Sequence, residues 1–427
     1  MKKVLQETIG KGIRFTCITT QKFKTSCLSL NLILPLGAVD PALYAVLPRI
    51  LRRGTTEYPD RNQLGAQLDR LYGARLEPTV RRRGEALCIG LISDVIDEAY
   101  AGGEKLVLKT AELMGQVLLS PVRENGLLLP AYVAGERENL MDEIRAQIND
   151  KKSYARSRMH ALMCQDEAYG KNILGTLEQA AAITSEALET AYGQMLKTAE
   201  IQLFYCGTQS AETVKAAFLS ALAPLERETI QPVKTRVIRQ VSHPVREVTE
   251  EMDTVQGKLS MGFRTGVSAE EAGYPAFMLF NTAFGGSTSS KLFLNVREKK
   301  SLCYYASSTS DKLKGVMTVD SGIENRNFEV TRDEILHQLA GVQAGELSQE
   351  ELDSARRTLT YAFQAAEDSP IALEGFYLTN GVGRLADSPM DMVEKLNRTS
   401  REQVIAAAGR VQLDTVYFLK GGAGNAN

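Results

Sequence analysis

The feature that most constrains the fold of this chain is an internal duplication. Residues 183–207 (ITSEALETAYGQMLKTAEIQLFYCG) and 398–421 (RTSREQVIAAAGRVQLDTVYFLKG) share one layout: a capped helix, a short turn and a strand that ends in glycine. The copies lie about 215 residues apart, whereas solenoid repeats recur every roughly 20–50 residues. This spacing predicts two homologous domains rather than a repeat array.

The length of 427 residues agrees with two domains, because one hydrophobic core rarely serves more than about 300 residues. We place the domains at 1–224 and 254–427. The intervening residues 225–253 are polar, contain two prolines and lack helical periodicity, so they are interpreted as a linker.

Local patterns predict α+β domains. Alternating apolar residues predict strands at 13–19 and 26–34, interpreted as an antiparallel hairpin, and a second hairpin turns at 83–85. Asp40 suits a helix N-cap and Pro41 the first helical position, which predicts a helix through 40–54. Further helices are predicted at roughly 61–72, 96–118, 124–148 and 152–164. Strands in hairpins and helices in blocks favour an antiparallel sheet with helices packed on one face.

Composition excludes several classes of function. Fifty basic and fifty-two acidic side chains leave a net charge of −2, which gives no reason to expect nucleic acid or an anionic membrane as a partner. The chain has no apolar run long enough to span a bilayer and no apolar run behind its N-terminal lysines. Six scattered cysteines without a CxxC pair indicate a reduced, cytoplasmic protein. Cys17 and Cys27 either face each other across the predicted hairpin or are two separate buried thiols.

Residues 285–307 (GGSTSSKLFLNVREKKSLCYYAS) combine glycines, hydroxyls, a charged helix and a tyrosine pair. A phosphate-binding P-loop is excluded, because Lys291 lacks the preceding glycine and the following hydroxyl of that motif. Ser289 or Ser290 suits the cap of a helix that ends in basic residues. The basic turn Arg81-Arg82-Arg83 is interpreted as a solvated turn or, alternatively, a contact for an acidic peptide.

The string FGGSTSSKLFLNVREKKSLCYYAS resembles the C-terminal-half signature of the insulinase/pitrilysin family of zinc peptidases, the inverzincins, which include proteins like the mitochondrial processing peptidase. The resemblance extends to DEAYGKNILGTLEQ (166–179), ERENLMDEIRAQIND (136–150) and ELSQEELDSARRTLTYAFQAAEDSP (346–370), and so covers nearly the whole chain. It implies two homologous α+β domains that form one half of a metallopeptidase chamber.

Arg297 and Tyr304 match the Arg/Tyr pair that, in this family, holds the substrate backbone near the scissile bond. A guanidinium and a phenol can both donate hydrogen bonds to a peptide carbonyl or to the oxyanion formed from it. Without the resemblance, the same residues would be a surface arginine in an ion pair and a tyrosine in a strand.

The zinc motif of the family, His-x-x-Glu-His, is degenerate in this chain. The resemblance aligns it with residues 45–49, where Ala45 and Arg49 replace the histidines and Pro48 replaces the glutamate that activates water. Glu143 matches the third metal ligand and Glu136 the nearby acidic residue. One carboxylate cannot hold zinc alone, so we expect Glu143 to pair with Arg49 or another cation, or to face solvent. We expect no metal and no other cofactor.

The histidines offer no replacement for the missing ligands. His160, His243 and His337 are the only three, and they are far apart in sequence, so each is interpreted as a surface or half-buried residue. No G-x-S-x-G motif or cysteine-based metal site is present.

The resemblance implies a non-catalytic homologue, inactive alone. We expect it to bind peptide or unfolded polypeptide and to complete a proteolytic chamber with a zinc-bearing homologue as a heterodimer, or with itself as a homodimer. The alternatives are a peptide-binding scaffold in a protein-modification complex and an active metallopeptidase. Residues 23–37 and 47–76 are most similar, within this family, to bacterial proteins associated with aminopentanol modification of elongation factor P.

Overall fold

The computed structural model describes residues 3–422 and divides into two compact units. The first unit holds residues up to 145 together with 172–234 and 369–382, and the second holds 146–171, 235–368 and the residues from 383 onward. Neither unit is therefore one contiguous stretch. The domains predicted at 1–224 and 254–427 are contiguous. In the structure, residues 146–171 belong to the second unit, and residues 369–382 belong to the first.

The first unit is built on a six-stranded sheet with the order β1-β2-β8-β3-β5-β4. Its strands are β1 (Lys3–Gly10), β2 (Ile13–Thr19), β3 (Thr25–Pro35), β4 (Arg75–Arg83), β5 (Ala86–Ile96) and β8 (Glu200–Gly207), with a small separate ribbon of β6 (Arg123–Glu124) and β7 (Leu127–Leu128). Every pair in the main sheet is antiparallel except β2 with β8.

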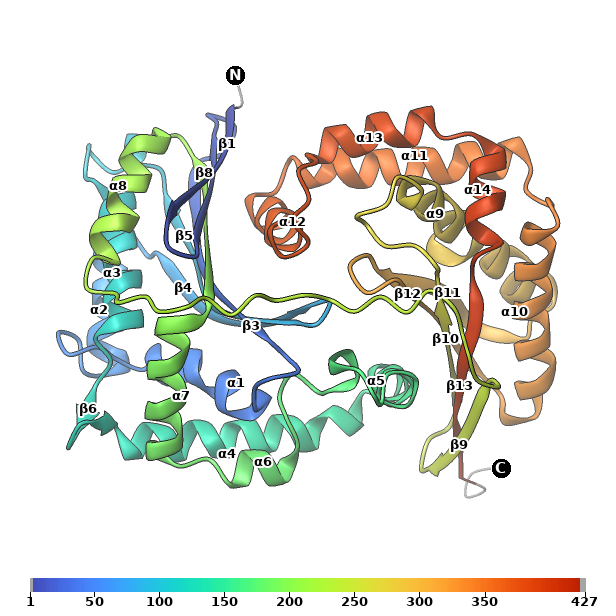
Figure 1. Cartoon of the computed structure of the whole chain (residues 1–427), viewed down its shortest axis with the longest axis horizontal. Coiled ribbons are helices and arrows are strands. Elements are labelled where there is room, and N and C mark those ends of the chain that lie inside the picture. The colour runs from blue at the N-terminus through green and yellow to red at the C-terminus, as the bar shows by residue number, and fades with distance from the viewer. Residues whose placement is uncertain (1–2, 423–427) are drawn as a thin grey trace. The chain divides into compact units, whose positions relative to one another are not determined.

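The helices predicted from residues 40 and 61 begin at Pro41 and Arg61, whereas those predicted from 96 and 124 begin later, at Leu106 and Pro130. Asp40 caps α1 by accepting a hydrogen bond from the Ala42 amide at 3.0 Å, and Pro41 occupies the first helical position. The helices are α1 (Pro41–Leu51), α2 (Arg61–Arg70), α3 (Leu106–Leu119), α4 (Pro130–Ala146), α6 (Leu177–Ala181), α7 (Ser185–Thr198), α8 (Ala211–Ala221) and α12 (Pro370–Val382), with a 3₁₀ turn η1 (Glu98–Tyr100). Figure 1 shows α3, α7 and α8 on one side of the sheet and α12 on the other.

The predicted hairpin of residues 13–19 and 26–34 is wrong. Both segments are strands, but β8 lies between them, parallel to β2 and antiparallel to β3. Cys17 and Cys27 therefore do not face each other. Cys27 instead lies opposite Cys206 of β8, and both thiols are fully buried. The partner strand comes from 180 residues further along the chain, a pairing that local sequence does not signal.

The second unit repeats this plan on a five-stranded sheet with the order β11-β12-β10-β13-β9. The strands are β9 (Arg246–Met252), β10 (Gly257–Arg264), β11 (Cys303–Asp311), β12 (Val316–Ile323) and β13 (Gln412–Gly421), and only β9 with β13 is parallel. The duplicated segments form α7 with β8 and α14 with β13. The predicted α+β class is confirmed, with one parallel pair in each sheet.

The helices of the second unit include two π-helical stretches at the signature string. They are α5 (Lys151–Met163), α9 (Tyr274–Asn281), α10 (Phe328–Gln343), α11 (Gln349–Ala366), α13 (Pro389–Arg398) and α14 (Arg401–Ala408), with the π-helices η4 (Thr282–Gly286) and η5 (Leu292–Lys299) and the 3₁₀ turns η2 (Gln147–Asn149), η3 (Ala168–Gly170) and η6 (Asn325–Asn327). Among these residues and the rest of 3–422, no helix is both long and apolar enough to cross a membrane.

The linker predicted at 225–253 is partly structured. Its last residues form β9, which pairs with β13. Near its start, Arg227 donates hydrogen bonds to the carbonyl oxygens of Leu196 and Ala199 at the end of α7. A guanidinium at this position satisfies carbonyl groups that the helix leaves unpaired. Proline and polar composition concealed both features.

The strand β3 is buried on both faces although its sequence alternates. Leu28, Leu30 and Leu32 face one side, while the other side carries Ser29 and Asn31, and each of these side chains is at most 1% exposed. An alternating strand is typical of a sheet with one solvated face. Here α12, from the other end of the chain, covers the polar face by packing on β3 and β8.

Buried polar partners hold α12 on this face. The carboxylate of Glu374 accepts hydrogen bonds from Ser29 Oγ at 2.9 Å, Asn31 Nδ2 at 3.1 Å and Arg81 Nη1 at 2.6 Å. Its side chain is 0% exposed. Because a buried charge is tolerated only when it is paired and hydrogen-bonded, these partners fix the position of the helix. Arg81 is thus a structural residue and not part of a solvated turn.

The second unit uses the same arrangement. The face of β10 that carries Ser260, Gly262 and Arg264 is covered by α5. Gly262 has no room for a side chain, because a Cβ atom there would lie 2.4 Å from Met159 Sδ. On the next strand, Asp320 accepts hydrogen bonds from Arg156 of α5 at 2.7 Å and from Ser260 Oγ at 2.8 Å.

The segment after α5 adds a second buried cluster. Glu167 pairs with Arg264 at 2.7 Å and with Lys314, and Arg264 also pairs with Asp414 at 2.8 Å. All four side chains are at most 3% exposed. Burial would raise the pKa of Glu167, but hydrogen bonds from Arg264 and Lys314 outweigh it and lower the pKa. The carboxylate therefore stays ionised where it anchors this segment.

We predict that Glu374→Gln destabilises the protein by roughly 3 kcal/mol, because it leaves Arg81 without a counter-charge in a buried position. Urea unfolding followed by circular dichroism measures the loss. The matched control is Glu394→Gln, which removes an exposed helical pair with Arg398 and should cost at most about 0.5 kcal/mol. Equal effects of the two substitutions would contradict the anchoring role.

The same carboxylate predicts a dependence of stability on pH. Burial would raise the pKa of Glu374, but hydrogen bonds and charge from Arg81 outweigh it, so the pKa in the folded protein is lowered. The unfolded chain then binds more protons once the pH falls below the ordinary glutamate pKa of about 4.3, and the stabilisation is lost through that window. Urea unfolding at several pH values between 7 and 3 should show the loss, and Glu374→Gln should show a shallower one.

Candidate functional site

The helix α1 carries the three positions that the family resemblance aligns with the zinc motif. Ala45 is 0% exposed and Pro48 is buried, whereas the side chain of Arg49 is 24% exposed. Pro48 lies inside the helix and has no amide hydrogen to donate to the preceding turn. None of these three side chains can coordinate zinc.

The two glutamates on α4 that match acidic positions of the family both form ion pairs with arginines. Glu143 Oε2 lies 2.6 Å from Arg49 Nη2, so the ion pair expected from the sequence is present. Glu136, with a side chain only 4% exposed, accepts hydrogen bonds from Arg53 Nε and Arg61 Nη2, both at 2.7 Å. Asn139 donates a third bond at 3.0 Å. The guanidinium groups thus neutralise both carboxylates without a metal.

The roles of Arg53 and Arg61 were not predicted from the sequence. Arg53 ends the turn after α1, and Arg61 begins α2. The only sequence signal was a group of arginines beside the aligned motif, and nothing in their spacing linked them to a glutamate some 80 residues away. Within residues 3–422, no group of three or more histidine, cysteine or acidic side chains is arranged to hold a metal ion.

The three histidines all belong to the second unit, whereas α1 belongs to the first. His160 Nε2 is 2.8 Å from Thr318 Oγ1, and its ring packs edge-on against Tyr169. His243 contacts the Pro244 carbonyl oxygen and lies 3.7 Å from Asp414, while His337 is exposed on α10. Each has the surface or half-buried setting expected from the sequence.

Arg297 and Tyr304 lie on adjacent elements of the second unit. Arg297 belongs to η5, its side chain is 41% exposed, and its guanidinium lies 4.7 Å from the centre of the Phe293 ring. The helix η5 packs directly on β11, which carries Tyr304. Burial raises the pKa of the Cys303 thiol, while a hydrogen bond with Ser321 and the charge of Arg297 oppose that shift.

A break in the sheet orients Tyr304. The register of β11 with β12 passes from Cys303 opposite Ile323 to Tyr305 opposite Gly322, so Tyr304 is an extra, bulged residue. A β-bulge redirects a side chain, and bulges are frequent beside functional sites. Tyr304 is 53% exposed. The guanidinium of Arg297 and the phenol of Tyr304 are thus both accessible, on two elements that pack together.

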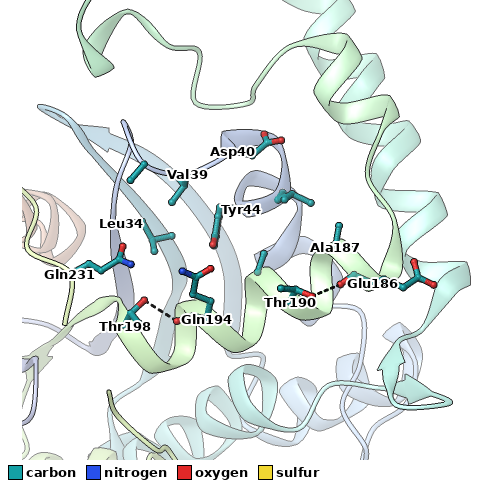
Figure 2. Close-up of a pocket in the computed structure, with 13 residues that line it drawn as sticks. Leu34, Val39, Asp40, Tyr44, Glu186, Ala187, Thr190, Gln194, Thr198 and Gln231 are labelled. Carbon is teal, nitrogen blue, oxygen red and sulfur yellow. Dashed lines mark hydrogen bonds between the residues drawn. The ribbon is translucent and has the colours of Figure 1, made fainter. Parts of the chain in front are cut away.

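A pocket of about 520 Å³ lies between α1 and α7 in the first unit. Figure 2 shows Tyr44 of α1 and Gln194 of α7 approaching each other across it, with Asp40 and Glu186 at its end. Its lining contains these two acidic residues and no basic one. None of the positions aligned with the zinc motif lines this pocket, so it does not belong to that site.

Comparison with known proteins identifies the family. The chain is 30% identical over 414 residues to the probable inactive metalloprotease YmfF of Bacillus subtilis, and the match covers 97% of each chain. The chain belongs to the M16 peptidase family. Residues 182–359 also match the family described as Peptidase M16 inactive domain. The recognition from sequence is therefore confirmed: the chain is an M16 peptidase-like protein, similar to a relative and a domain that are described as inactive.

Solved structures agree in fold along the whole M16 chain. A conserved protein from Enterococcus faecalis is 24% identical, with a TM-score of 0.90 and coverage of 99% of both chains. The peptidase M16 inactive domain from Pseudomonas fluorescens is 16% identical, with a TM-score of 0.80 and full coverage of both chains. At these identities the likeness establishes the fold alone.

We predict that a histidine introduced on the buried face of α1 destabilises the protein. Ala45→His should lower stability by about 1–3 kcal/mol, because an imidazole must enter a fully buried site. Arg49→His on the same helix replaces a partly exposed side chain in a partly exposed ion pair and should cost less than about 1 kcal/mol. Thermal denaturation compares the two variants. An Ala45→His protein as stable as the wild type would mean that this face is open.

Proposed function

We propose that this protein is a non-catalytic subunit that pairs with a zinc-bearing M16 homologue and binds peptide together with it. In this proposal the partner supplies the zinc ion and the water it activates, while this chain supplies Arg297 and Tyr304. The observation that carries the proposal is that Glu136 and Glu143 of α4 are both ion-paired with arginines.

The ion pairs support an accessory role in two ways. A guanidinium is charged at every physiological pH, so Arg49 repels a dication at the place where the family binds zinc. Ala45 and Pro48 provide neither a ligand nor a general base, and both are buried. A chain with this arrangement gains a proteolytic role only through a partner.

Arg297 and Tyr304 are suited to hold a peptide backbone. A guanidinium donates several hydrogen bonds in a plane, and a phenol donates one, so both can bind a carbonyl oxygen and stabilise the charge that develops on it. Both side chains are about half exposed. Among the contacts within residues 3–422, Arg297 has only a 3.5 Å contact with the neighbouring Glu298 and the aromatic contact with Phe293, which leaves donors for a ligand.

We predict that Arg297→Ala or Tyr304→Phe lowers the turnover of the reconstituted pair about 10²–10³-fold, the effect of losing one oxyanion donor. The protein is co-expressed with the zinc-bearing M16 homologue of the same cell, and cleavage of unfolded polypeptide is measured. Matched controls are Arg326→Ala and Tyr361→Phe, which alter an arginine and a tyrosine that are also exposed on the second unit. These controls should leave turnover unchanged.

Two outcomes would overturn the proposal. If neither Arg297→Ala nor Tyr304→Phe affects cleavage by the pair, the protein is a scaffold that binds peptide without taking part in proteolysis. If the purified chain alone contains stoichiometric zinc, or hydrolyses peptides in a chelator-sensitive way, it is a peptidase in its own right. Metal analysis of the isolated chain separates this last case from the others.

A further inference from the structure

A row of three residues crosses the sheet of the second unit beneath the start of α5. Lys258 of β10 lies opposite Gly322 of β12, and Gly322 lies opposite Tyr305 of β11. The missing side chain at Gly322 makes room for the aromatic ring, since a Cβ atom there would lie 2.5 Å from Tyr305 Cε1. The ring of Tyr305 therefore spreads over Gly322 toward Lys258, whose ammonium lies 6.0 Å from the ring centre.

A second ammonium approaches the same ring from α5. Lys152, in the first turn of that helix, places its Nζ atom 4.3 Å from the centre of the Tyr305 ring. One aromatic ring thus has two lysines beside it. Each cation is attracted by the face of the ring, but the two repel each other.

No ion pair among the described residues relieves this repulsion. In the part of the chain that the structure describes, neither Lys152 nor Lys258 forms an ion pair, and Lys258 has only a 3.3 Å contact with the Gln256 side chain. Burial lowers the pKa of Lys258, and the charge of Lys152 lowers it further, while Asp150 opposes the shift. The site therefore carries unbalanced positive charge.

The two nearby acids are already engaged. Asp150 caps α5, where its oxygens accept hydrogen bonds from the amides of Lys152 and Ser153 and from Ser153 Oγ. Asp320 binds Arg156 and Ser260. Among residues 3–422 no hydrogen bond to the phenol oxygen of Tyr305 is formed, whereas its backbone carbonyl accepts one from Ser321 Oγ. Two ammonium groups and a phenol thus share one aromatic ring, and the acceptor that contacts Lys258 is the neutral Gln256 side chain.

We propose that Lys152, Lys258 and Tyr305 form a binding site for a compact oxyanion. Two ammonium groups and a phenol match the lone pairs of a carboxylate or a phosphate, and the anion would neutralise the lysine pair. A peptide carboxylate and free inorganic phosphate share this chemistry. The site lies wholly within the second unit and uses neither Arg297 nor Tyr304, so it is independent of the proposed function.

The experiment follows the lysines directly in the full-length protein. Reductive methylation with ¹³C-formaldehyde labels each lysine and keeps its charge, and Lys152→Arg and Lys258→Arg assign the two resonances. The probes are sodium phosphate, N-acetyl-alanyl-alanine and the C-terminal amide of that dipeptide, each added at constant ionic strength against sodium chloride.

We expect both resonances to shift saturably with an oxyanion and not with the amide or with chloride. Saturation by the dipeptide acid alone assigns a peptide carboxylate, saturation by phosphate alone assigns phosphate, and either result supports the site. Lys152→Gln or Lys258→Gln should weaken binding about ten-fold. Lys420→Gln, which removes a lysine already paired with Glu251, should have no effect.

Tyr305→Phe separates the roles of the ring and the hydroxyl. This variant keeps the aromatic surface on Gly322 and removes one donor, so it should weaken binding while its melting temperature stays close to that of the wild type. Shifts that rise linearly with every probe, chloride and amide included, would overturn the proposal. So would a lysine variant that binds the oxyanion as tightly as the Lys420→Gln control.

Discussion

The structure of each unit depends on covering the polar face of a sheet with a helix that brings its own polar partners. In the first unit this helix is α12, anchored by Glu374, and in the second it is α5, anchored through Asp320. Both anchors are carboxylate–arginine pairs with further hydrogen bonds from neighbouring side chains. A hydrophobic face accepts many helix positions, but a buried carboxylate accepts only the position in which its donors meet it.

The same pairing of arginine with carboxylate shapes the region that the family uses for zinc. Glu143 and Glu136 keep their places on α4, and Arg49, Arg53 and Arg61 supply the positive charge that a metal would otherwise bring. The region is therefore electrostatically complete without a cofactor. Lys152 and Lys258 present the opposite situation, because two cations share one ring and neither forms an ion pair within residues 3–422. The contrast separates residues that stabilise the fold from residues available to a ligand.

Much of the local structure was predictable because its causes are local. Asp40 and Pro41 specify the start of α1, and the turn at Gly84 joins β4 to β5 as the predicted hairpin. The Arg49–Glu143 pair was among the expectations, since the family alignment brought those two positions together. The strand β9 was missed because the polar residues around two prolines resemble a linker, and the bulge at Tyr304 was missed because it depends on the pairing of β11 with β12.

The sequence by itself determined the duplication, the class of the two domains and the family, because each of these depends on residue identity and short-range spacing. Only the tertiary structure decided that β8 separates β2 from β3, and that Gly322 brings Tyr305 toward Lys258. It also decided that α5 belongs to the second unit and α12 to the first, although the segments that precede each helix in sequence, ending at residues 145 and 368, belong to the other unit. The physical reason is distance along the chain. An alternating strand has the same pattern whether its polar face meets water or a buried carboxylate, and only the partner that arrives from far away distinguishes the two.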